Sequence, residues 1–599
     1  MSFNTSVAQV FERMAAMLEL TGADKFRVNA HARAARSVGD HAGDLEPIAG
    51  DEKALTAIEG IGKGTAAKIA EFARTGTVAE HDELLAKVPP GLLEVLRVPG
   101  LGPKTVKLMW EQLKIESVDD LKATIADGSL AGLPRMGAKT IDNIADALAF
   151  MADSGKRLHA GVARPIAEMI RARLAEVPGV TRVAYAGSLR RGRETVGDLD
   201  FLVTADDPGA AMEAFRGMAG VEKVLAAGET KSSVRLALPE LGGKRFSADD
   251  SASVQVDLRV VPAESWGAAL MYFTGSKDHN VRLRERALKR GMTLNEYGLF
   301  EDDGGEGSPQ SRGVVPVASA TEEDVYGALD LAWVPPTMRE DRGELDAADG
   351  GTLPELVTLD DIRAELHSHT TASDGVMEIL ESARIAKGRG FHTLAVTDHS
   401  KSSAIANGLS PERLRAHIGA IREADEEIKG ISILAGSEVD ILADGALDYD
   451  DELLGDLDVV VASPHAALSQ DAKKATTRLL RAIEHPLVHI IGHPTGRLIE
   501  RRRGLEPAMD EIIAAAVEHN VALEINAHWM RLDLRDTHVR AAAESGCLIA
   551  IDCDVHAPGD YDNLVFGVET GQRGWLTKEL CVNAWSKARL HGWLKKGRG

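Results

Sequence analysis

Two aspartates, Asp198 and Asp200, lie one residue apart in GDLDFLV, behind a Gly-Ser pair and two arginines. Residues two apart in a β-strand point to the same side, so both carboxylates would project from one face of a sheet. Neighbouring carboxylates repel each other unless a divalent cation lies between them, and Asp257 in VQVDLRV offers a third ligand from a separate strand. This spacing predicts a two-metal centre for phosphoryl transfer.

The residues just before the aspartate pair predict a nucleotide site. Ser188 and Arg191 lie at a predicted strand-to-helix turn, between Gly187 and Gly192. A hydroxyl and a guanidinium at such a turn can hold the outer phosphates of a nucleotide. The cations and the carboxylates would then bind one triphosphate–metal complex. The alternative is an exposed hairpin that carries these charges by chance.

A second set of candidate ligands follows strand-like runs in the carboxyl-terminal half. These candidates are His367, His369, Asp374, Asp398, His399, Glu438, His465, His493, Asp554 and His556. A single histidine at a strand end is more often a hydrogen-bonded structural residue, but six such strand ends favour one shared site. Active sites of parallel barrels gather at the carboxyl ends of the strands, and mixed nitrogen and oxygen ligands suit Zn2+ or Mn2+.

The elements that must position these residues fall into successive regions of the chain. Helical periodicity extends to about residue 155, and short apolar runs typical of strands begin near residue 182. Residues 301–313 are rich in Gly, Ser and acid and predict an exposed loop, and residues 343–358 predict a linker. After about residue 358, strand-like runs alternate with helical stretches, which is typical of a parallel α/β fold.

Length and charge limit the classes of protein. A chain of 599 residues exceeds the roughly 250–300 residues that one core supports, so we expect several domains. The net charge of −23 argues against nucleic acid as a partner, yet residues 1–300 carry 39 basic and 40 acidic residues. Charge therefore does not exclude DNA. No run approaches the roughly 18 apolar residues of a membrane helix, and we expect a cytoplasmic protein with free cysteines and no membrane partner.

The helical region contains a near-repeat, IEGIGKGTAAKI and VPGLGPKTVKL, with a degraded third copy at LPRMGAKTIDNI. A Gly-x-Gly hairpin between two helices exposes backbone N–H groups at a helix start, where a phosphate binds well. A plain helical corner is the alternative reading, but the repetition favours a sequence-independent grip on the DNA backbone. The residues concerned are Gly60, Gly62, Gly100, Gly102, Lys63, Lys104 and Lys139, with Lys68 on the helix after the first hairpin.

Together with GETKSSV and with YFTGSKDHNVRLRERALKRGMTLNEYGLF from Tyr272, these motifs resemble DNA polymerase family X, whose members include DNA polymerase beta. The resemblance covers residues 1–342. It implies that the three aspartates bind two catalytic ions, Mg2+ or Mn2+, and that Asp257 helps to deprotonate the primer 3′ hydroxyl. It also implies that Arg284 meets the template strand and that the nucleotide is held by Gly187, Ser188, Arg191, Gly197, Tyr272, Phe273, Gly275 and Asn280.

The same resemblance makes residues 1–80 similar to a small domain that grips the 5′ phosphate across a gap. Lys68 aligns with the lysine that some members use, through a Schiff base, to remove a 5′-deoxyribose phosphate. His31 and Arg27 stand where the beta-type enzyme has a tyrosine and a lysine, which puts lyase activity in doubt. Gln255 replaces an arginine near the third aspartate, which puts proton management around Asp257 in question.

Residues 360–585 are similar to the polymerase and histidinol phosphatase (PHP) domain, a distorted (β/α)7 barrel with a trinuclear metal site. The resemblance selects nine of the candidates as ligands, all except Asp398. ASDG, GHPTGR and LEINA are versions found behind a bacterial family X polymerase. His528 is a departure from the pattern. The resemblance implies up to three Mn2+ or Zn2+ ions and a manganese-stimulated 3′–5′ exonuclease that in some members also cuts abasic sites.

We therefore expect a multidomain α+β and α/β protein with helix-hairpin-helix domains, a beta-type nucleotidyltransferase palm and a PHP barrel. The expected boundaries are 1–80 (5′-phosphate binding), 81–155 (fingers-like), 156–270 (palm), 271–342 (thumb), 343–358 (linker) and 359–599 (PHP). The expected function is filling of short gaps in gapped or nicked primer-template DNA with dNTPs, by a monomer, in base excision repair or end joining. The alternatives are a barrel that hydrolyses small phosphoesters and a non-catalytic scaffold that binds DNA ends.

Overall fold

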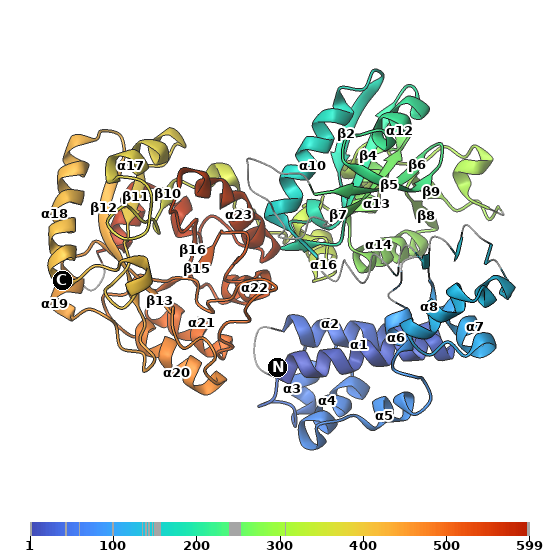
Figure 1. Cartoon of the computed structure of the whole chain (residues 1–599), viewed down its shortest axis with the longest axis horizontal. Coiled ribbons are helices and arrows are strands. Elements are labelled where there is room, and N and C mark those ends of the chain that lie inside the picture. Colours follow the sequence, from blue (N-terminus) through green and yellow to red (C-terminus); the bar gives the residue numbers. More distant parts are fainter. Residues whose placement is uncertain are drawn as a thin grey trace. The chain divides into compact units, whose positions relative to one another are not determined.

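The computed structural model describes residues 3–595, except for residues 42–44, 59, 97, 99–100, 135, 138–139, 142–143, 146–147, 149–156, 239–252 and 306. The chain divides into two compact units, residues 1–156 and residues 157–599. The first unit is helical in its described part, and the second contains every described strand (Figure 1). No described helix is both long and apolar enough to span a membrane.

The helices of the first unit form where the periodicity predicts them. Helices α1 and α2 pack against each other, and α4, α5 and α7 complete a core that includes Phe11, Met14 and Ile69 (Figure 1). The helices are α1 (Phe3–Thr21), α2 (Lys25–Asp40), α3 (Glu52–Thr56), α4 (Lys63–Thr75), α5 (Ala79–Leu85), α6 (Leu92–Val95), α7 (Pro103–Leu113) and α8 (Val118–Ala126), followed by a 3₁₀ helix, η1 (Ser129–Gly132).

Two of the predicted Gly-x-Gly hairpins end at the start of a helix. Gly62 is the N-cap of α4 and Gly102 is the N-cap of α7, and neither helix has a side-chain cap. Gly60 has a φ of +84°, and a Cβ there would lie 2.2 Å from the Ser37 hydroxyl, so the hairpin requires glycine. The first N–H groups of both helices are thus available to an anion. Gly100 and Lys139 lie outside the described residues.

A five-stranded sheet in the order β2-β4-β7-β6-β5 forms the palm. Strands β4 and β7 are parallel, and the other neighbours are antiparallel. Helices α10 and α12 cover one face, where Phe201 and Val203 of β4 pack with Val256 and Leu258 of β7. The intervening residues of both strands therefore face the other way. The elements are β1 (Leu158–His159), α10 (Ala160–Ala175), β2 (Val180–Tyr185), α11 (Gly187–Arg190), β3 (Thr195–Val196), β4 (Asp198–Ala205), α12 (Pro208–Arg216), β5 (Val221–Ala227), β6 (Lys231–Ala237) and β7 (Ser253–Val260).

The thumb follows the palm directly and has its own core around Leu283, Leu299 and Tyr326. Its elements are η2 (Ala263–Ser265), α13 (Trp266–Thr274), α14 (Lys277–Lys289), the hairpin β8 (Met292–Asn295) and β9 (Gly298–Glu301), η3 (Pro309–Arg312), α15 (Glu322–Ala328), η4 (Pro336–Met338) and α16 (Glu344–Gly350).

Helix α16 differs from the linker predicted at residues 343–358. Its residues Leu345 and Ala348 are buried in the thumb core. Glu344 is also buried, and its Oε1 lies 2.6 Å from Nδ1 of His279 on α14. The Gly- and Asp-rich composition suggested an exposed connection, but these buried contacts fix the segment as part of the thumb.

The rest of the second unit is the predicted (β/α)7 barrel. Seven parallel strands lie side by side in chain order, and a bridge between Ser368 and Val555 joins the ends of the first and last, so the sheet is nearly closed. The strands are β10 (Ala364–Glu365), β11 (Thr393–Val396), β12 (Ser432–Asp440), β13 (Val459–Ser463), β14 (Ile490–Ile491), β15 (Ala522–Asn526) and β16 (Ile549–Asp552). The helices are η5 (Leu359–Asp361), α17 (Ile379–Gly388), η6 (Ala404–Ala406), α18 (Pro411–Glu427), α19 (Asp451–Gly455), α20 (Ala472–Ile483), α21 (Met509–Glu518), α22 (Asp536–Glu544), η7 (Pro558–Asn563), α23 (Leu564–Arg573), η8 (Val582–Ala584) and α24 (Lys587–Trp593).

Residues beyond the last strand fill the inside of the barrel. Trp585, Leu590 and Trp593 are buried in one cluster with Ile490 and Ala550. Ile490 is the first residue of β14, and Ala550 is the second residue of β16. This end of the barrel is therefore packed with apolar side chains. The carboxyl ends of the strands, where the candidate ligands lie, form the opposite end.

Candidate active sites

The three palm aspartates lie on neighbouring parallel strands. Strand β4 begins at Asp198, and Asp200 is the register partner of Asp257 on β7. Ser188 lies in α11, and Gly197 lies between β3 and β4. Among the described residues, three or more metal-binding side chains bring their donor atoms within 4.8 Å of one another only in the barrel. The palm carboxylates are therefore spaced more widely than the barrel ligands.

The palm carboxylates disfavour one another's charge. Burial raises the pKa of Asp200 to about 7, and the carboxylates of Asp198 and Asp257 add to the rise. Burial also raises the pKa of Asp198, with a further contribution from Asp257. A divalent cation between such groups would favour their ionised forms.

The turn after β2 brings a guanidinium to these carboxylates. Gly187 has a φ of +59°, and a Cβ there would lie 2.2 Å from Asp200 Oδ2, so the turn requires glycine. Arg191 follows α11 and opposes the rise in the pKa of Asp200. Its Nε lies 3.0 Å from Glu340 Oε1, and its Nη1 donates to the Thr274 carbonyl at 2.9 Å. The side chain is thus held in place beside the aspartates.

Two further side chains of β7 act on the aspartates. Gln255 Nε2 donates a hydrogen bond of 3.0 Å to Asp257 Oδ1. Arg259, two residues beyond Asp257 and so on the same face, opposes the rise in the pKa of Asp200. Its guanidinium carbon lies 4.4 Å from the ring centre of Phe273. Sequence reasoning did not select Arg259, although the alternation in VQVDLRV places it on the aspartate face.

The predicted sugar and base contacts cluster at the turn between α13 and α14. The rings of Tyr272 and Phe273 meet edge to face, with their centres 5.2 Å apart. Asn280 Nδ2 donates to the carbonyls of Tyr272, at 2.6 Å, and Gly275, at 3.2 Å. Asn280 therefore closes this turn. Arg284 lies one helical turn later on α14 and is exposed.

In the first unit, Lys68, Arg27 and His31 all lie close to the carboxylate of Glu80. Lys68 Nζ lies 3.1 Å from Glu80 Oε2. The same carboxylate lies 2.5 Å from an Arg27 nitrogen and 3.7 Å from His31 Nε2. An ammonium group paired with a carboxylate is not free to attack as a neutral amine. Lys104, at the second hairpin, is the second residue of α7.

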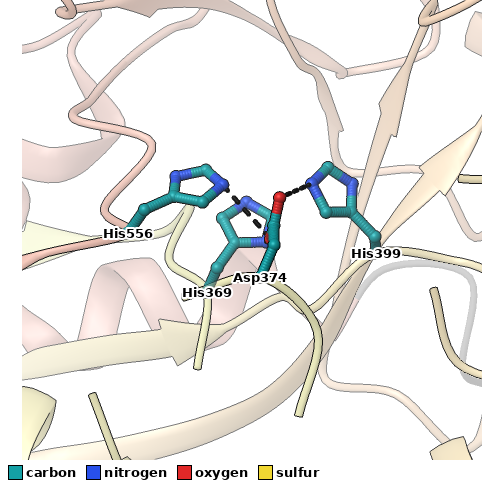
Figure 2. A group of neighbouring side chains, drawn as sticks. All are labelled: His369, Asp374, His399 and His556. Atoms are coloured by element: carbon teal, nitrogen blue, oxygen red, sulfur yellow. Dashed lines mark ion pairs between the residues drawn. The ribbon is translucent and has the colours of Figure 1, made fainter. Parts of the chain in front are cut away.

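All nine predicted barrel ligands come together in the structure. Their donor atoms form four groups, in each of which the atoms lie within 4.8 Å of one another. The groups are His369, Asp374, His399 and His556; His367, His369 and Asp554; His367, Glu438 and His493; and His399, Glu438 and His465. Figure 2 shows the first group, with the Asp374 carboxylate paired to both His399 and His556.

Glu438 on β12 links two of these groups. Its Oε1 lies 2.8 Å from His493 Nε2, 3.1 Å from His465 Nε2 and 3.3 Å from His367 Nε2. Its Oε2 lies 2.8 Å from His399 Nδ1. Glu438 is buried, and a carboxylate shared in this way could supply ligand atoms to more than one cation.

The histidines of the barrel differ in charge because their neighbours differ. Burial opposes protonation of His399, but Glu438 and Asp374 raise its pKa to about 10. Burial likewise opposes protonation of His465, whose pKa Glu438 and Asp440 raise to about 9. Burial and the neighbouring His556 and His399 lower the pKa of His369 to about 4. Cation binding would displace the protons of the first two, because histidine coordinates metal in its neutral form.

The donor atoms fit a metal site of several ions. Several buried ligand atoms approach one another in ion pairs but form no hydrogen bond, namely His367 Nε2, His369 Nε2, His399 Nδ1, Glu438 Oε2 and Asp554 Oδ1. His369 Nδ1 and His493 Nδ1 are also buried without a hydrogen bond. Buried polar atoms of native proteins nearly always have partners. Imidazole and carboxylate donors together suit Zn2+ or Mn2+.

Acids behind the ligands were missed by sequence reasoning. Glu524 Oε1 lies 2.6 Å from His367 Nδ1, and its Oε2 accepts the backbone N–H of His493 at 2.5 Å. Asp440 Oδ1 lies 2.5 Å from His465 Nδ1. Such acids orient a ligating imidazole and decide which nitrogen faces the metal. LEINA marks the position of Glu524, but only its contact with a residue 157 positions away reveals its role.

His528, the departure from the family pattern, lies in a loop that contacts the palm. Its ring stacks on that of Trp529, with the centres 5.6 Å apart. Trp529 packs against Gly161 of α10, where a Cβ would lie 2.1 Å from the indole. The glycine on α10 therefore allows close contact between the barrel loop and the palm.

Family models match four parts of the chain. Two are described as a helix-hairpin-helix domain and a SAM-like helix-hairpin-helix tandem, and they match residues 2–78 and 92–149. A DNA polymerase beta thumb model matches residues 269–340, and a PHP domain model matches residues 365–528. The matched parts agree with the predicted order of domains.

Curated relatives cover both halves of the chain. The DNA polymerase/3′-5′ exonuclease PolX of Bacillus subtilis is 35% identical over 590 residues, which are 98% of this chain and 99% of that protein. DNA polymerase lambda of Rattus norvegicus is 27% identical over 57% of this chain and 56% of its own length. A probable phosphatase of Thermoanaerobacter sp. is 28% identical over 37% of this chain and 89% of its own length.

Proposed function

Because this chain belongs to the family X DNA polymerases that carry a PHP domain, we propose that its palm aspartates and its barrel ligands catalyse two opposed reactions on DNA ends. The enzyme is a DNA polymerase with a 3′–5′ exonuclease, and its substrates are DNA and deoxynucleotides. The observation that supports this division is the presence of two separate donor sets: aspartates on β4 and β7, and nine ligands in the barrel.

In the palm, Asp198, Asp200 and Asp257 would hold two Mg2+ or Mn2+ ions. When bound, these ions lower the pKa of the primer hydroxyl and stabilise the charge on the leaving oxygen. Asp257 accepts the proton of the primer 3′ hydroxyl, and the hydrogen bond from Gln255 keeps its carboxylate oriented. Arg191 binds the outer phosphates of the nucleotide.

The thumb selects the nucleotide. Tyr272 and Phe273 line the sugar pocket and exclude a 2′ hydroxyl, because the turn at Gly275 brings backbone close to the sugar. Asn280 holds that turn through its two carbonyl contacts and faces the base edge. Arg284, exposed on α14, contacts the template strand.

In the barrel, the nine ligands would hold up to three ions, Mn2+ or Zn2+. When bound, the ions supply an activated water and stabilise the charge that develops on a phosphodiester. Glu438 bridges the ligand groups, and Glu524 and Asp440 orient the imidazoles of His367 and His465. The chain uses this site to remove 3′ nucleotides, and cleavage at abasic sites is a second reaction of the same site.

The first unit grips DNA without reading its sequence. Gly60, Gly62 and Gly102 present helix N-termini to backbone phosphates on either side of a short gap. Residues 1–80 bind the 5′ phosphate, and residues 81–155 hold the duplex. Lys68 contributes charge rather than Schiff-base chemistry, because it is paired with Glu80. We propose that the enzyme acts as a monomer on gapped or nicked DNA in base excision repair or end joining.

The test uses a gapped duplex with dNTPs and Mn2+, given to the wild type, Asp257→Ala and His369→Ala. We expect Asp257→Ala to lose extension and keep degradation, and His369→Ala to do the reverse. Loss of both activities in either variant would contradict two separate sites.

The barrel also resembles small phosphatases. The probable phosphatase of Thermoanaerobacter sp. aligns with this chain over 230 residues, which are 89% of its own length. A barrel that hydrolyses small phosphoesters would act on sugar phosphates and leave 3′-labelled DNA intact. We expect the opposite, and the two substrates assayed with one preparation distinguish these functions.

A further inference from the structure

We propose that helix α23 of the barrel positions the nucleotide-binding turn of the palm, residues 187–193, and that Arg573 is its positioning residue. This role, which rests on the proposed function of the turn in holding the incoming triphosphate, is separate from metal binding in the barrel. None of the nine barrel ligands lies on α23. The PHP barrel would thereby contribute to polymerisation without taking part in its chemistry.

Arg573, the last residue of α23, reaches from the barrel to the turn. Its Nη1 donates to the Arg191 carbonyl at 2.9 Å and to Glu340 Oε1 at 2.8 Å. Its Nη2 donates to Asp536 Oδ2 on α22 at 2.7 Å. Arg573 is only 4% exposed, so these charge-assisted hydrogen bonds form away from water, where they are strongest. One guanidinium therefore ties α22, the thumb and the palm turn together.

Glu340 is shared between the barrel and the turn. Its Oε1 lies 3.0 Å from Arg191 Nε and 3.7 Å from Arg193 Nη1, as well as 2.8 Å from Arg573. Two carboxylates, Glu340 and Asp536, face four guanidinium groups, those of Arg191, Arg193, Arg342 and Arg573. Positive charge therefore remains at the turn for a phosphate. Without Arg573, Glu340 would pair more fully with Arg191, and the Arg191 carbonyl would lose its donor. Both changes weaken the hold on a triphosphate.

A glycine in the turn allows α23 to approach. Gly192 has a φ of +65°, and a Cβ there would lie 2.9 Å from the Cβ of Glu569, one helical turn before Arg573. Glu569 forms an ion pair with Arg164 on α10 of the palm. The turn is therefore flanked by two ion pairs, at Arg573 and at Glu569, that join α23 to the palm and thumb.

The experiment compares Arg573→Ala and Arg573→Lys with Gln572→Ala. Gln572 is the neighbouring residue of α23 and contacts Thr337 Oγ1 and the Val357 carbonyl, which lie outside the turn. Filling of a one-nucleotide gap is measured over a range of dNTP concentrations in Mn2+. Exonuclease activity on a 3′-labelled single strand is measured in the same preparations.

We expect Arg573→Ala to raise the KM for dNTP roughly five- to tenfold, with kcat changed by less than about twofold. Arg573→Lys should give a smaller rise, because an ammonium cannot match the planar fork that meets several acceptors. Gln572→Ala should leave the KM unchanged, and exonuclease activity should remain in all three variants.

An unchanged KM in Arg573→Ala would overturn the proposal, as would an equal rise in Gln572→Ala or a parallel loss of exonuclease activity. If Arg573→Ala does not fold, a double-mutant cycle of Arg573→Lys with Glu340→Gln replaces it. Non-additive changes in KM support the shared carboxylate, and additive changes refute it. A wild type that incorporates no nucleotide would instead refute the proposed function.

Discussion

Replacement of Asp200 by asparagine should stabilise the metal-free enzyme while abolishing polymerisation. The pKa of Asp200 rises from 3.8 to about 7 in the fold, chiefly through burial, so its ionisation is disfavoured there. The difference corresponds to about 4 kcal/mol, and partial solvent screening reduces it to roughly 2–4 kcal/mol. Each kcal/mol shifts the Tm of a domain of this size by about 2–4 °C, so we expect a gain of roughly 5–15 °C.

The pH dependence distinguishes this cause from a general packing effect. Because the pKa is higher in the folded than in the unfolded state, the wild type suffers no penalty below about pH 4, where the group is protonated in both states. The penalty grows between about pH 4 and 7 and is complete above that range. The gain in Asp200→Asn should therefore be full at pH 8 and less than about half as large at pH 5.

The assay is thermal unfolding in EDTA at both pH values, with Asp206→Asn as the matched control. Asp206 lies in the exposed turn after the same strand. Added Mg2+ should raise the Tm of the wild type more than that of Asp200→Asn. A Tm for Asp200→Asn equal to or below that of the wild type in EDTA at pH 8 would refute the reasoning, and so would a gain that does not vary with pH.

Three further outcomes concern the barrel and the first unit. Glu438→Gln should reduce exonuclease activity by roughly a thousandfold or more and leave gap filling intact, because its carboxylate belongs to two of the ligand groups. Equal loss of both activities would contradict this. Glu524→Gln should weaken Mn2+ binding about 10- to 100-fold, since His367 loses the acid that orients its ring. Excess Mn2+ should restore the exonuclease rate, and failure to do so would count against an orienting role. Wild type treated with 5′-deoxyribose phosphate DNA and borohydride should give no covalent adduct at Lys68, because this lysine is paired with Glu80. An adduct that forms in the wild type but not in Lys68→Ala would show that Lys68 reacts as a free amine despite this pairing.

The placement of both sets of side chains could be predicted because it depends on local periodicity. Asp198 and Asp200 share a face of β4 because strand side chains alternate, and the order of strands in a parallel barrel follows the chain. Ligands at successive strand ends, such as His399 and His465, must therefore lie at one end of the barrel. The nine ligand positions and the seven strands follow from these two rules and from the family resemblance.

Contacts between distant segments could not be predicted in this way. Glu524 orients His367 across 157 positions, and nothing in the neighbourhood of either residue marks the pair. The linker prediction failed for a similar reason, since Glu344 is fixed by His279, which is 65 positions away. Composition describes a segment alone, whereas burial depends on which other segment reaches it.

The cluster of Trp585 and Trp593 inside the barrel has a consequence for biosynthesis. Both residues are translated after all seven strands, about 230 residues behind β10, which begins at Ala364. At translation rates of about 5–20 residues per second, the first strand waits roughly 10–50 s for the residues that cover its inner face. During that interval the apolar side chains on the inner faces of the strands, including Ile490 once it has been translated, are exposed to solvent and can cause aggregation. High-level expression should therefore benefit from slower translation or from chaperones that bind these side chains.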